Sequence, residues 1–262
     1  MFKPIFKAVL PVAAIAIAAG LSGCNDMNIT IDGEGGVPLA ELDLSGDPPS
    51  AVVLAGPDKV IISDGDTLEI DVSGEQEAVD ALRFSLKGDK LAIARKPGQV
   101  KGDTYATIHV TMPAPKEVVI AGPGTIEAAS LAGDAKANIA GSGTLKVAAI
   151  EAESLDVNVL GSGTFEAAGK AATLDLNIAG SGSARMGGLV VDKADIAIAG
   201  SGDAAFASDG EVSAKVMGSG DVTITGRATC KVKSMGSGSV TCKPSASDEA
   251  SEEGDEPTGD AS

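Results

Sequence analysis

The chain has few of the side chains that carry chemistry in most active sites and binding sites. Its 262 residues include no Trp, one Tyr, five Phe and a single His, His109. A stacking platform for bases or sugar rings needs several aromatic rings, so it is poorly supplied here. Acidic residues outnumber basic ones by 37 to 20, which gives a formal net charge of −17. This charge argues against a nucleic-acid partner and against electrostatic adhesion to anionic lipid.

The N-terminal residues predict export and lipid attachment. Lys3 and Lys7 are followed by an apolar run, residues 8–19, that is too short to span a membrane. Leu21-Ser22-Gly23-Cys24 then matches the lipobox of bacterial lipoproteins, although an ordinary signal peptide with an incidental cysteine is the alternative. We expect residues 1–23 to be a lipoprotein signal peptide, with Cys24 lipidated at the start of a linker over residues 24–50.

Gly-Ser-Gly recurs along the second half of the chain at a nearly constant interval. An imperfect copy, Gly122-Pro123-Gly124, precedes six intact ones, and successive first glycines are 18 to 20 residues apart. The glycines of the intact copies are Gly141 and Gly143, Gly161 and Gly163, Gly180 and Gly182, Gly200 and Gly202, Gly218 and Gly220, and Gly236 and Gly238. A fixed period of this length indicates one structural unit stacked on itself.

Within each repeat, apolar and polar residues alternate with a period of two. Leu155, Val157 and Val159 lead to one Gly-Ser-Gly, and Phe165 and Ala167 follow it, with polar residues between them. Alternation of this kind is typical of a strand with one buried face. Each unit therefore reads as a strand, a glycine corner, a second strand and a short return. This pattern predicts an all-β fold, a right-handed parallel β-helix (β-solenoid) with about 19 residues per coil. A β-sandwich of hairpins is the alternative, but the other half of the repeat lacks a regular turn signal.

The remaining segments divide the chain further. Residues 51–115 lack the 19-residue period, and we interpret them as an irregular β cap with the first coils, continuous with the repeats at 116–242. The expected strands are Ala51–Leu54, Val60–Ser63, Thr67–Val72, Leu82–Leu86, Leu91–Ala94 and Tyr105–Met112, and Leu39–Leu44 could pair as another. Residues 243–262 hold seven acidic residues and one lysine, and their composition predicts an acidic disordered tail.

The cysteines predict one disulfide. If Cys24 carries lipid, Cys230 and Cys242 remain, in an envelope compartment that permits disulfides. Both occupy inward columns of the last repeat, on either side of its glycine corner. We therefore expect a Cys230–Cys242 bond that ties the two strands of the final coil together.

Several segments together match a known family. They are Val52–Pro57, Val60–Asp66, Thr111-Met112-Pro113 and the Gly-Ser-Gly series. In this combination, residues 51–242 resemble the bacterial auto-transporter adhesin head GIN domain family. The resemblance implies a parallel β-helix and a cell-envelope location, and it supplies no catalytic residues.

Two kinds of ligand site that use glycine turns fit the repeat poorly. A phosphate-binding Gly-x-Gly needs a helix after it, whereas another strand follows here. The turns ending in Asp203 and Asp221 resemble calcium-binding β-roll turns, but those need Asp in every copy of a shorter repeat. We therefore expect no metal and no cofactor.

An acidic column is the strongest candidate for catalysis. One outward column holds Asp156, Asp175 and Asp195. The column two residues further along each strand holds Asn138, Asn158 and Asn177. Polysaccharide-cleaving β-helices use clustered carboxylates of this type. We favour a solvated face with an asparagine ladder between coils, and predict no catalytic residue and no enzyme.

The combined hypothesis is a bacterial lipoprotein of the cell envelope, anchored in a membrane through its N-terminal lipid. It presents a rigid β-solenoid as an adhesin or interaction module for an unknown protein or carbohydrate ligand. The alternative is a polysaccharide-binding or polysaccharide-cleaving β-helix. The inner or outer membrane stays open, because Asn25 and Asp26 are ambiguous as a sorting signal.

Overall fold

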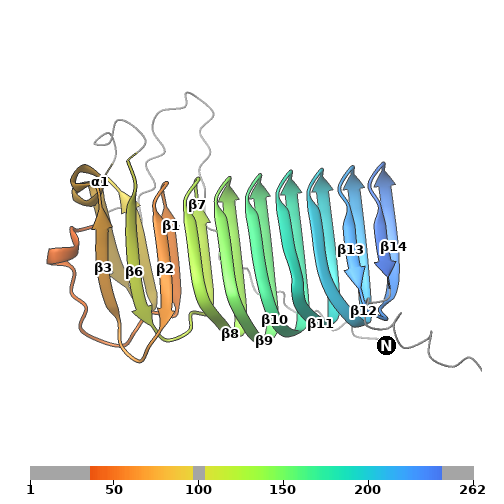
Figure 1. Ribbon diagram of the computed structural model, residues 1–262, viewed down its shortest axis with the longest axis horizontal. Coiled ribbons are helices and arrows are strands. Elements are labelled where there is room, and N and C mark those ends of the chain that lie inside the picture. The colour runs from red at the N-terminus through yellow and green to blue at the C-terminus, as the bar shows by residue number, and fades with distance from the viewer. Residues whose placement is uncertain (1–35, 97–103, 244–262) are drawn as a thin grey trace, which may run out of the picture.

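The computed structural model describes residues 36–96 and 104–243, which form an elongated solenoid of β-strands (Figure 1). Helical structure in this part is limited to a 3-10 turn, η1 (Leu39–Glu41), and a short helix, α1 (Gln76–Ala81). The strands are β1 (Ala51–Ala55), β2 (Lys59–Asp64), β3 (Glu69–Gly74), β4 (Leu82–Lys87), β5 (Lys90–Arg95), β6 (Ala106–Met112), β7 (Glu117–Ala121), β8 (Thr125–Gly141), β9 (Thr144–Gly161), β10 (Thr164–Gly180), β11 (Ser183–Gly200), β12 (Asp203–Gly218), β13 (Val222–Thr225), β14 (Thr229–Gly236) and β15 (Val240–Lys243).

Successive repeats stack as parallel strands in register. Gly161 lies between Gly141 and Gly180, one coil apart on either side, and the neighbouring columns align in the same way. The pairs between β7 and β15 are all parallel, which excludes the sandwich of hairpins. The predicted β-solenoid is therefore confirmed, with about seven turns spaced 19 residues apart.

The short return that the repeat pattern predicts after the second strand is itself part of a strand. β8 to β12 each run without interruption from one glycine corner to the next, through the bend at the opposite edge. The bend is made by register shifts, such as the one between Ala167 and Gly169 against β9. Gly169 has a φ of +121° there. A bulge bends a strand at the cost of one local pairing, so the ladder resumes on both sides.

The two glycines of each corner are needed for different reasons. The first one has a positive φ, for example +119° at Gly141 and +124° at Gly180, which L-residues with a side chain rarely adopt. The second is required by close packing. A Cβ on Gly143 would lie 2.6 Å from Cγ2 of Ile120 and 2.7 Å from the carbonyl oxygen of Gly124 in the preceding coil.

β1 and β2 form a coil that the 19-residue count does not reveal. Ala55 pairs with Ala121, so Gly56, with a φ of +144°, stands in the column of the corner glycines. The chain then leaves the stack for β3, α1 and β4, forms an outer coil with β5 and β6, and returns at β7. The spatial order is therefore β4-β5-β1-β7-β8, and the insertion over residues 65–115 separates Gly56 from Gly122 in sequence.

The strands expected between residues 51 and 112 are present as β1 to β6, with ends within two residues of those predicted. The strand considered over Leu39–Leu44 is wrong, because this segment begins with the turn η1 and contains no strand; the isolated bridge nearby joins Val37, before the segment, to Phe84. Helix α1 was not expected. Its single buried pair, Ala78 and Ala81, is too short a pattern to reveal a helical period.

The interior of the stack is a continuous aliphatic core. Inward columns of the repeats are buried, and Phe165 and Phe206 are among the largest fully buried side chains. One buried ion pair joins the two N-terminal coils: Asp58, 1% exposed, accepts a hydrogen bond of 2.7 Å from Nε of Arg95. The same carboxylate accepts the backbone N–H of Ala106 at 2.8 Å. Asp58 therefore connects the β1–β2 coil to both strands of the outer coil.

The C-terminal end of the solenoid is open within the described residues. β14 pairs only with β12 there, and β15 only with β13. As a consequence Val232, in the same column as the buried Ala214, is 44% exposed. Cys230 and Cys242 continue two inward columns and are joined in a disulfide, with Cα atoms 6.9 Å apart.

Candidate functional site

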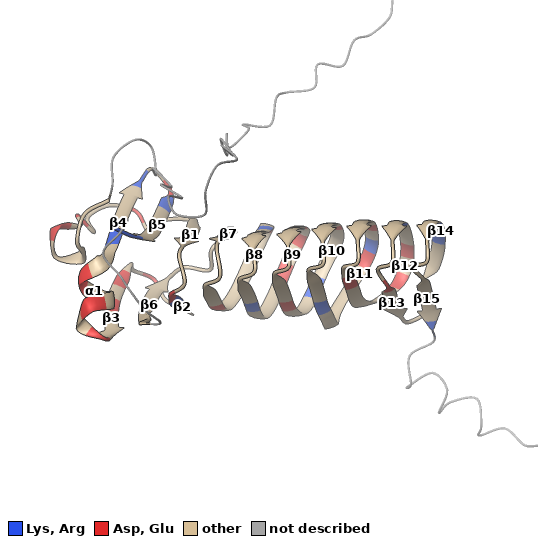
Figure 2. Cartoon of the chain, turned by 90° about the horizontal axis from the view of Figure 1, so that it is seen from above, with Lys and Arg blue, Asp and Glu red and all other residues tan. Residues whose placement is uncertain are grey.

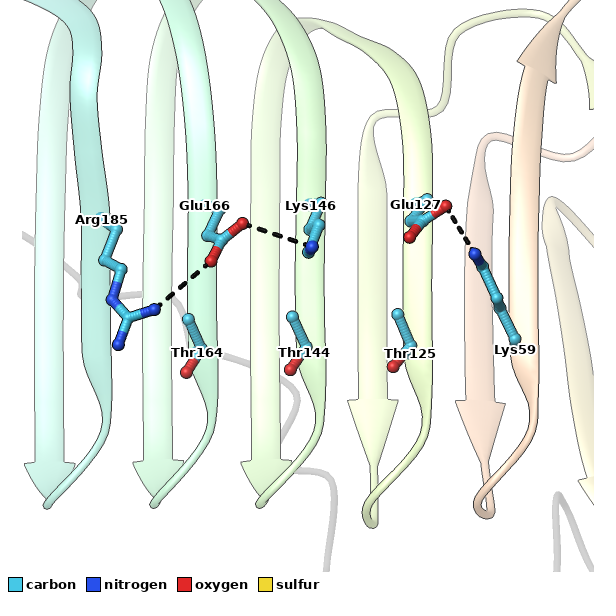
Figure 3. A pocket seen from close by; sticks show the side chains of 8 residues that line it. All are labelled: Lys59, Thr125, Glu127, Thr144, Lys146, Thr164, Glu166 and Arg185. Carbon is cyan, nitrogen blue, oxygen red and sulfur yellow. Dashed lines mark ion pairs between the residues drawn. The ribbon is translucent and has the colours of Figure 1, made fainter. Parts of the chain in front are cut away.

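On one face of the solenoid, charges alternate in sign from coil to coil (Figure 3). Glu127, Lys146, Glu166 and Arg185 pair in register on the first halves of β8, β9, β10 and β11. Lys59 on β2 extends the row by reaching toward Glu127. We call these five residues the charged row. The alternation follows from the stacking, because like charges directly opposite one another would destabilise the sheet.

The ion pairs of the charged row differ in strength. Nζ of Lys59 lies 2.8 Å from Oε2 of Glu127, which is hydrogen-bonding distance. Glu166 lies between two cations, 3.6 Å from Nζ of Lys146 and 3.6 Å from Nη1 of Arg185. These two distances are too long for hydrogen bonds. Lys146 and Arg185, with side chains 49% and 69% exposed, therefore keep N–H groups for an external acceptor.

A row of hydroxyl groups runs beside the charged row. Thr125, Thr144, Thr164 and Ser183 pair in register on the same strands, with the Thr164 and Ser183 hydroxyls 3.4 Å apart. Neighbouring strands of a sheet lie about 4.8 Å apart, so hydroxyls and charges repeat at that interval along the solenoid axis. The three threonines and the charged row line a shallow hollow of about 390 Å³ (Figure 3).

Sequence patterns reveal only part of this hollow. The 19-residue period by itself aligns Lys146, Glu166 and Arg185 in one outward column, and the structure pairs them in register. The imperfect copy at Gly122 aligns Glu127 with the same column, whereas Lys59 is missed, because the insertion separates β2 from the repeats and the register across it is not visible in the 19-residue period. Counting from Gly56 as a corner glycine would have placed Lys59 in the threonine column.

The face on the other side of the glycine corner carries the acidic column. Asp175 pairs in register with Asp156 and Asp195, as the sequence predicts. The expected asparagine ladder is only partly formed. Nδ2 of Asn158 donates to Oδ1 of Asn138 at 3.0 Å, whereas Asn177 donates to Asp175 of its own strand at 2.8 Å.

A second, smaller hollow of about 260 Å³ lies over this column. Asp175, Asn177, Asp195, Ser213 and Lys215 supply its polar lining. Residues 36–96 and 104–243 contain no group of three His, Cys, Asp or Glu side chains arranged to hold a metal ion.

Exposed aspartates tie the last coil to the one before it. Asp221 accepts the backbone N–H of Ser239 at 2.9 Å and its hydroxyl at 2.7 Å, and these hydrogen bonds lower the pKa of Asp221 below its ordinary value of 3.8. Asp209 accepts the backbone N–H of Arg227 at 2.8 Å, which lowers its pKa in the same direction. Hydrogen bonds to a carboxylate favour its charged form.

The structure leaves some predicted positions untested. Cys24, the signal segment at 1–23 and residues 244–262 lie outside the described residues. Neither η1 nor α1, the helices of the described part, is long and apolar enough to cross a membrane.

Comparison with solved structures shows the same fold in several bacterial proteins. A putative adhesin from Bacteroides fragilis superposes with a TM-score of 0.66 at 17% identity, covering 76% of this chain and 93% of its own. A putative adhesin from Parabacteroides merdae gives 0.59 at 21% identity, covering 76% and 92%. A putative lipid binding protein from Parabacteroides distasonis gives 0.57 at 22% identity, covering 75% and 93%.

Sequence comparison identifies the family. No curated protein matches the sequence at a significant level. A family model described as "Putative auto-transporter adhesin, head GIN domain" matches residues 48–228, which is more than half of the chain. The chain therefore belongs to the family described as "Putative auto-transporter adhesin, head GIN domain".

Proposed function

We propose that this protein is a lipid-anchored adhesin of the bacterial cell envelope that binds through the charged row and its threonines and catalyses no reaction. The observation that carries the proposal is the hollow of Figure 3, where charges and hydroxyls recur at the interval of the coils. The family membership supports an adhesin-like interaction module.

The shape of the hollow favours an extended ligand. It crosses strands from five coils, and it is shallow and open to solvent. An extended protein segment or polysaccharide laid along the solenoid axis would meet the same groups again at each coil. Each contact of this exposed kind is weak, so affinity would come from repetition and from many anchored copies acting together.

Lipidation of Cys24 would hold the solenoid at the membrane. Cys24 precedes β1 by fewer than 30 residues, so the linker at 24–50 would keep the N-terminal end of the stack near the bilayer. The solenoid is a stack of coils that contact only their neighbours, which suits a rigid extension from a surface.

A polysaccharide-binding or polysaccharide-cleaving protein is the second candidate. The hollow at Asp175, Asp195 and Lys215 favours it, because stacked carboxylates beside a cation are the groups such chemistry needs. Catalysis usually requires a site that excludes water, and this hollow is open, so we rank it below adhesion.

A single experiment separates adhesion from polysaccharide cleavage. The purified protein is incubated with an array of bacterial and host polysaccharides and surface proteins, and both retention and release of reducing ends are measured. We expect retention without product. Product release that Asp175→Ala or Asp195→Ala abolishes would replace adhesion with cleavage, and no retention on any array member would remove the adhesin proposal.

A further inference from the structure

The charged row ends at defined positions. On its C-terminal side Ala205 follows Arg185 in register, so the column carries no charge on β12. On its N-terminal side Ile61 occupies the column next to Glu127, and Lys59 reaches in from the threonine column. The row therefore holds five charges that alternate in sign, beginning and ending with a cation (Figure 3). Four intervals of about 4.8 Å make it about 19 Å long.

Both signs of charge are accessible to a ligand. Lys146 and Arg185 are exposed, and the side chains of Glu127 and Glu166 are 38% and 35% exposed. A polyanion laid on the row would meet these two carboxylates, on a chain whose net charge of −17 already repels it. Acidic residues also gather on α1 and β3 at the N-terminal end (Figure 2). A ligand with alternating charges and no net charge avoids both penalties and meets an opposite charge at every coil.

The interval between the charges distinguishes a polysaccharide from a protein segment. In an extended peptide, residues on one face recur about every 6.6 Å, so over four intervals the peptide runs about 7 Å ahead of the row. An α-helix presents one residue per turn of about 5.4 Å and drifts by about 2.4 Å, half an interval. An extended, β-linked sugar chain advances by close to one coil interval per sugar. Its hydroxyls also recur with every sugar, as the threonine hydroxyls do with every coil.

We propose that the charged row binds a zwitterionic polysaccharide in which an acidic sugar alternates with an amino sugar whose amine is free. Carboxylates of the polymer pair with Lys59, Lys146 and Arg185, and its amines pair with Glu127 and Glu166. Sugar hydroxyls exchange hydrogen bonds with the threonines beside the row. This ligand class rests on the proposed role of the charged row as the binding surface. Five charges correspond to about five sugars, so affinity should rise with chain length up to about that number and then level off.

Two oligosaccharides with one backbone test the charge pattern. Hyaluronan alternates a carboxylate with a neutral acetamido group, and its N-deacetylated form alternates a carboxylate with an amine. Calorimetry with the full chain measures the Kd of both hexasaccharides at low salt and slightly acidic pH, where the amines are protonated. We expect the N-deacetylated form to bind about five-fold or more tightly, because one exposed ion pair contributes up to about five-fold in affinity. The preference should shrink at 1 M salt, where the Debye length is about 3 Å.

A pair of matched variants locates the preference on the row. Glu127→Gln with Glu166→Gln leaves only cations there, so we expect it to abolish the preference and to strengthen hyaluronan binding. Glu151→Gln with Glu211→Gln removes the same charge from exposed positions of β9 and β12 outside the row, and should keep the native preference. Circular dichroism and urea unfolding verify that both variants fold.

The outcomes separate this ligand class from the adhesin proposal. Native protein that binds hyaluronan as tightly as the N-deacetylated form, or binds neither, would overturn the zwitterionic ligand, and so would the same change of preference in both variants. If another ligand then requires Lys146 and Arg185, the charged row stays the binding surface and only the ligand class is wrong. If no ligand requires these two residues, the proposed function is wrong as well.

Discussion

The buried ion pair between Asp58 and Arg95 gives the sharpest test of how the N-terminal coils are held on the stack. Asp58→Ala would leave Arg95, whose side chain is only 12% exposed, without its carboxylate, and the N–H of Ala106 without its acceptor. Breaking a buried pair by removing one partner typically costs about 3–5 kcal/mol. The orphaned N–H is part of that cost and is not added to it.

A matched control lies in the next coil. Glu127 and Lys59 also form an ion pair across coils, at 2.8 Å, but their side chains are 38% and 40% exposed. An exposed pair contributes about 0–1 kcal/mol, so Glu127→Ala should change stability little. In a double variant, Asp58→Ala with Arg95→Met, the buried cation is absent, and we expect part of the lost stability to return.

The chain contains its own reporter for this measurement. Tyr105 is the only tyrosine in a chain without tryptophan, and it directly precedes Ala106. Urea unfolding followed by Tyr105 fluorescence therefore reports the N-terminal end, while circular dichroism reports the whole stack. In Asp58→Ala, we expect the fluorescence transition to occur at a clearly lower urea concentration than the circular dichroism transition, because coils contact only their neighbours. A loss of stability no greater than that of Glu127→Ala would refute the reasoning.

Four further outcomes are expected. Gly163→Ala should lower the free energy of unfolding by at least about 1–3 kcal/mol, since its Cβ would lie 2.9 Å from the carbonyl oxygen of Gly143. Ser162→Ala, at the exposed corner, should change stability very little. Thermal unfolding compares the two variants, and similar melting temperatures would contradict the packing argument. Cys242→Ser should destabilise the end coil by about 2–4 kcal/mol, because it removes the disulfide with Cys230. We expect faster hydrogen exchange in β14 and β15 and no change in β9. Unchanged exchange in β14 and β15 would exclude a stabilising role for the disulfide. Folding lowers the pKa of Asp221, so its contact with Ser239 stabilises the last coil above pH 3.8, and this stabilisation is lost as the pH falls below that value. Below pH 3.8, amide hydrogen exchange in the last coil, corrected for its intrinsic pH dependence, should become faster in the native protein and change less in Asp221→Asn. Mass spectrometry of the membrane fraction should find an acylated N-terminal Cys24, and a soluble product unaffected by Cys24→Ala would refute the anchor.

How much the sequence reveals depends on whether the period is visible. From Gly122 onward the repeat predicts the parallel stacking, the buried columns and the partners of Lys146, Glu166 and Arg185, because one register fixes all of them. The coil of β1 and β2 is hidden, because 65 residues separate Gly56 from the next corner glycine and the inserted strands fold back outside β1.

Features set by tertiary contacts were not predictable. Whether Asn177 donates to Asn158 of its own column or to Asp175 of its own strand depends on side-chain geometry, which the repeat does not encode. The buried pairing of Asp58 with Arg95 joins the β1–β2 coil to a residue within the insertion, and neither residue has a distinctive sequence context. The exposure of Val232 follows from its place in the last coil, since the pattern alone assigns it to the core.

The central claim is that the charged row binds the ligand. The most direct measurement is the affinity of the best-retained array ligand for two double variants that each remove two positive charges, from different faces. The first variant combines Lys146→Gln with Arg185→Gln in the charged row. The second combines Lys136→Gln with Lys215→Gln on the face beyond the glycine corner. The account predicts that the first variant loses binding and the second keeps it. Equal binding by both variants, or loss only in the second, would contradict the assignment of the ligand to the charged row.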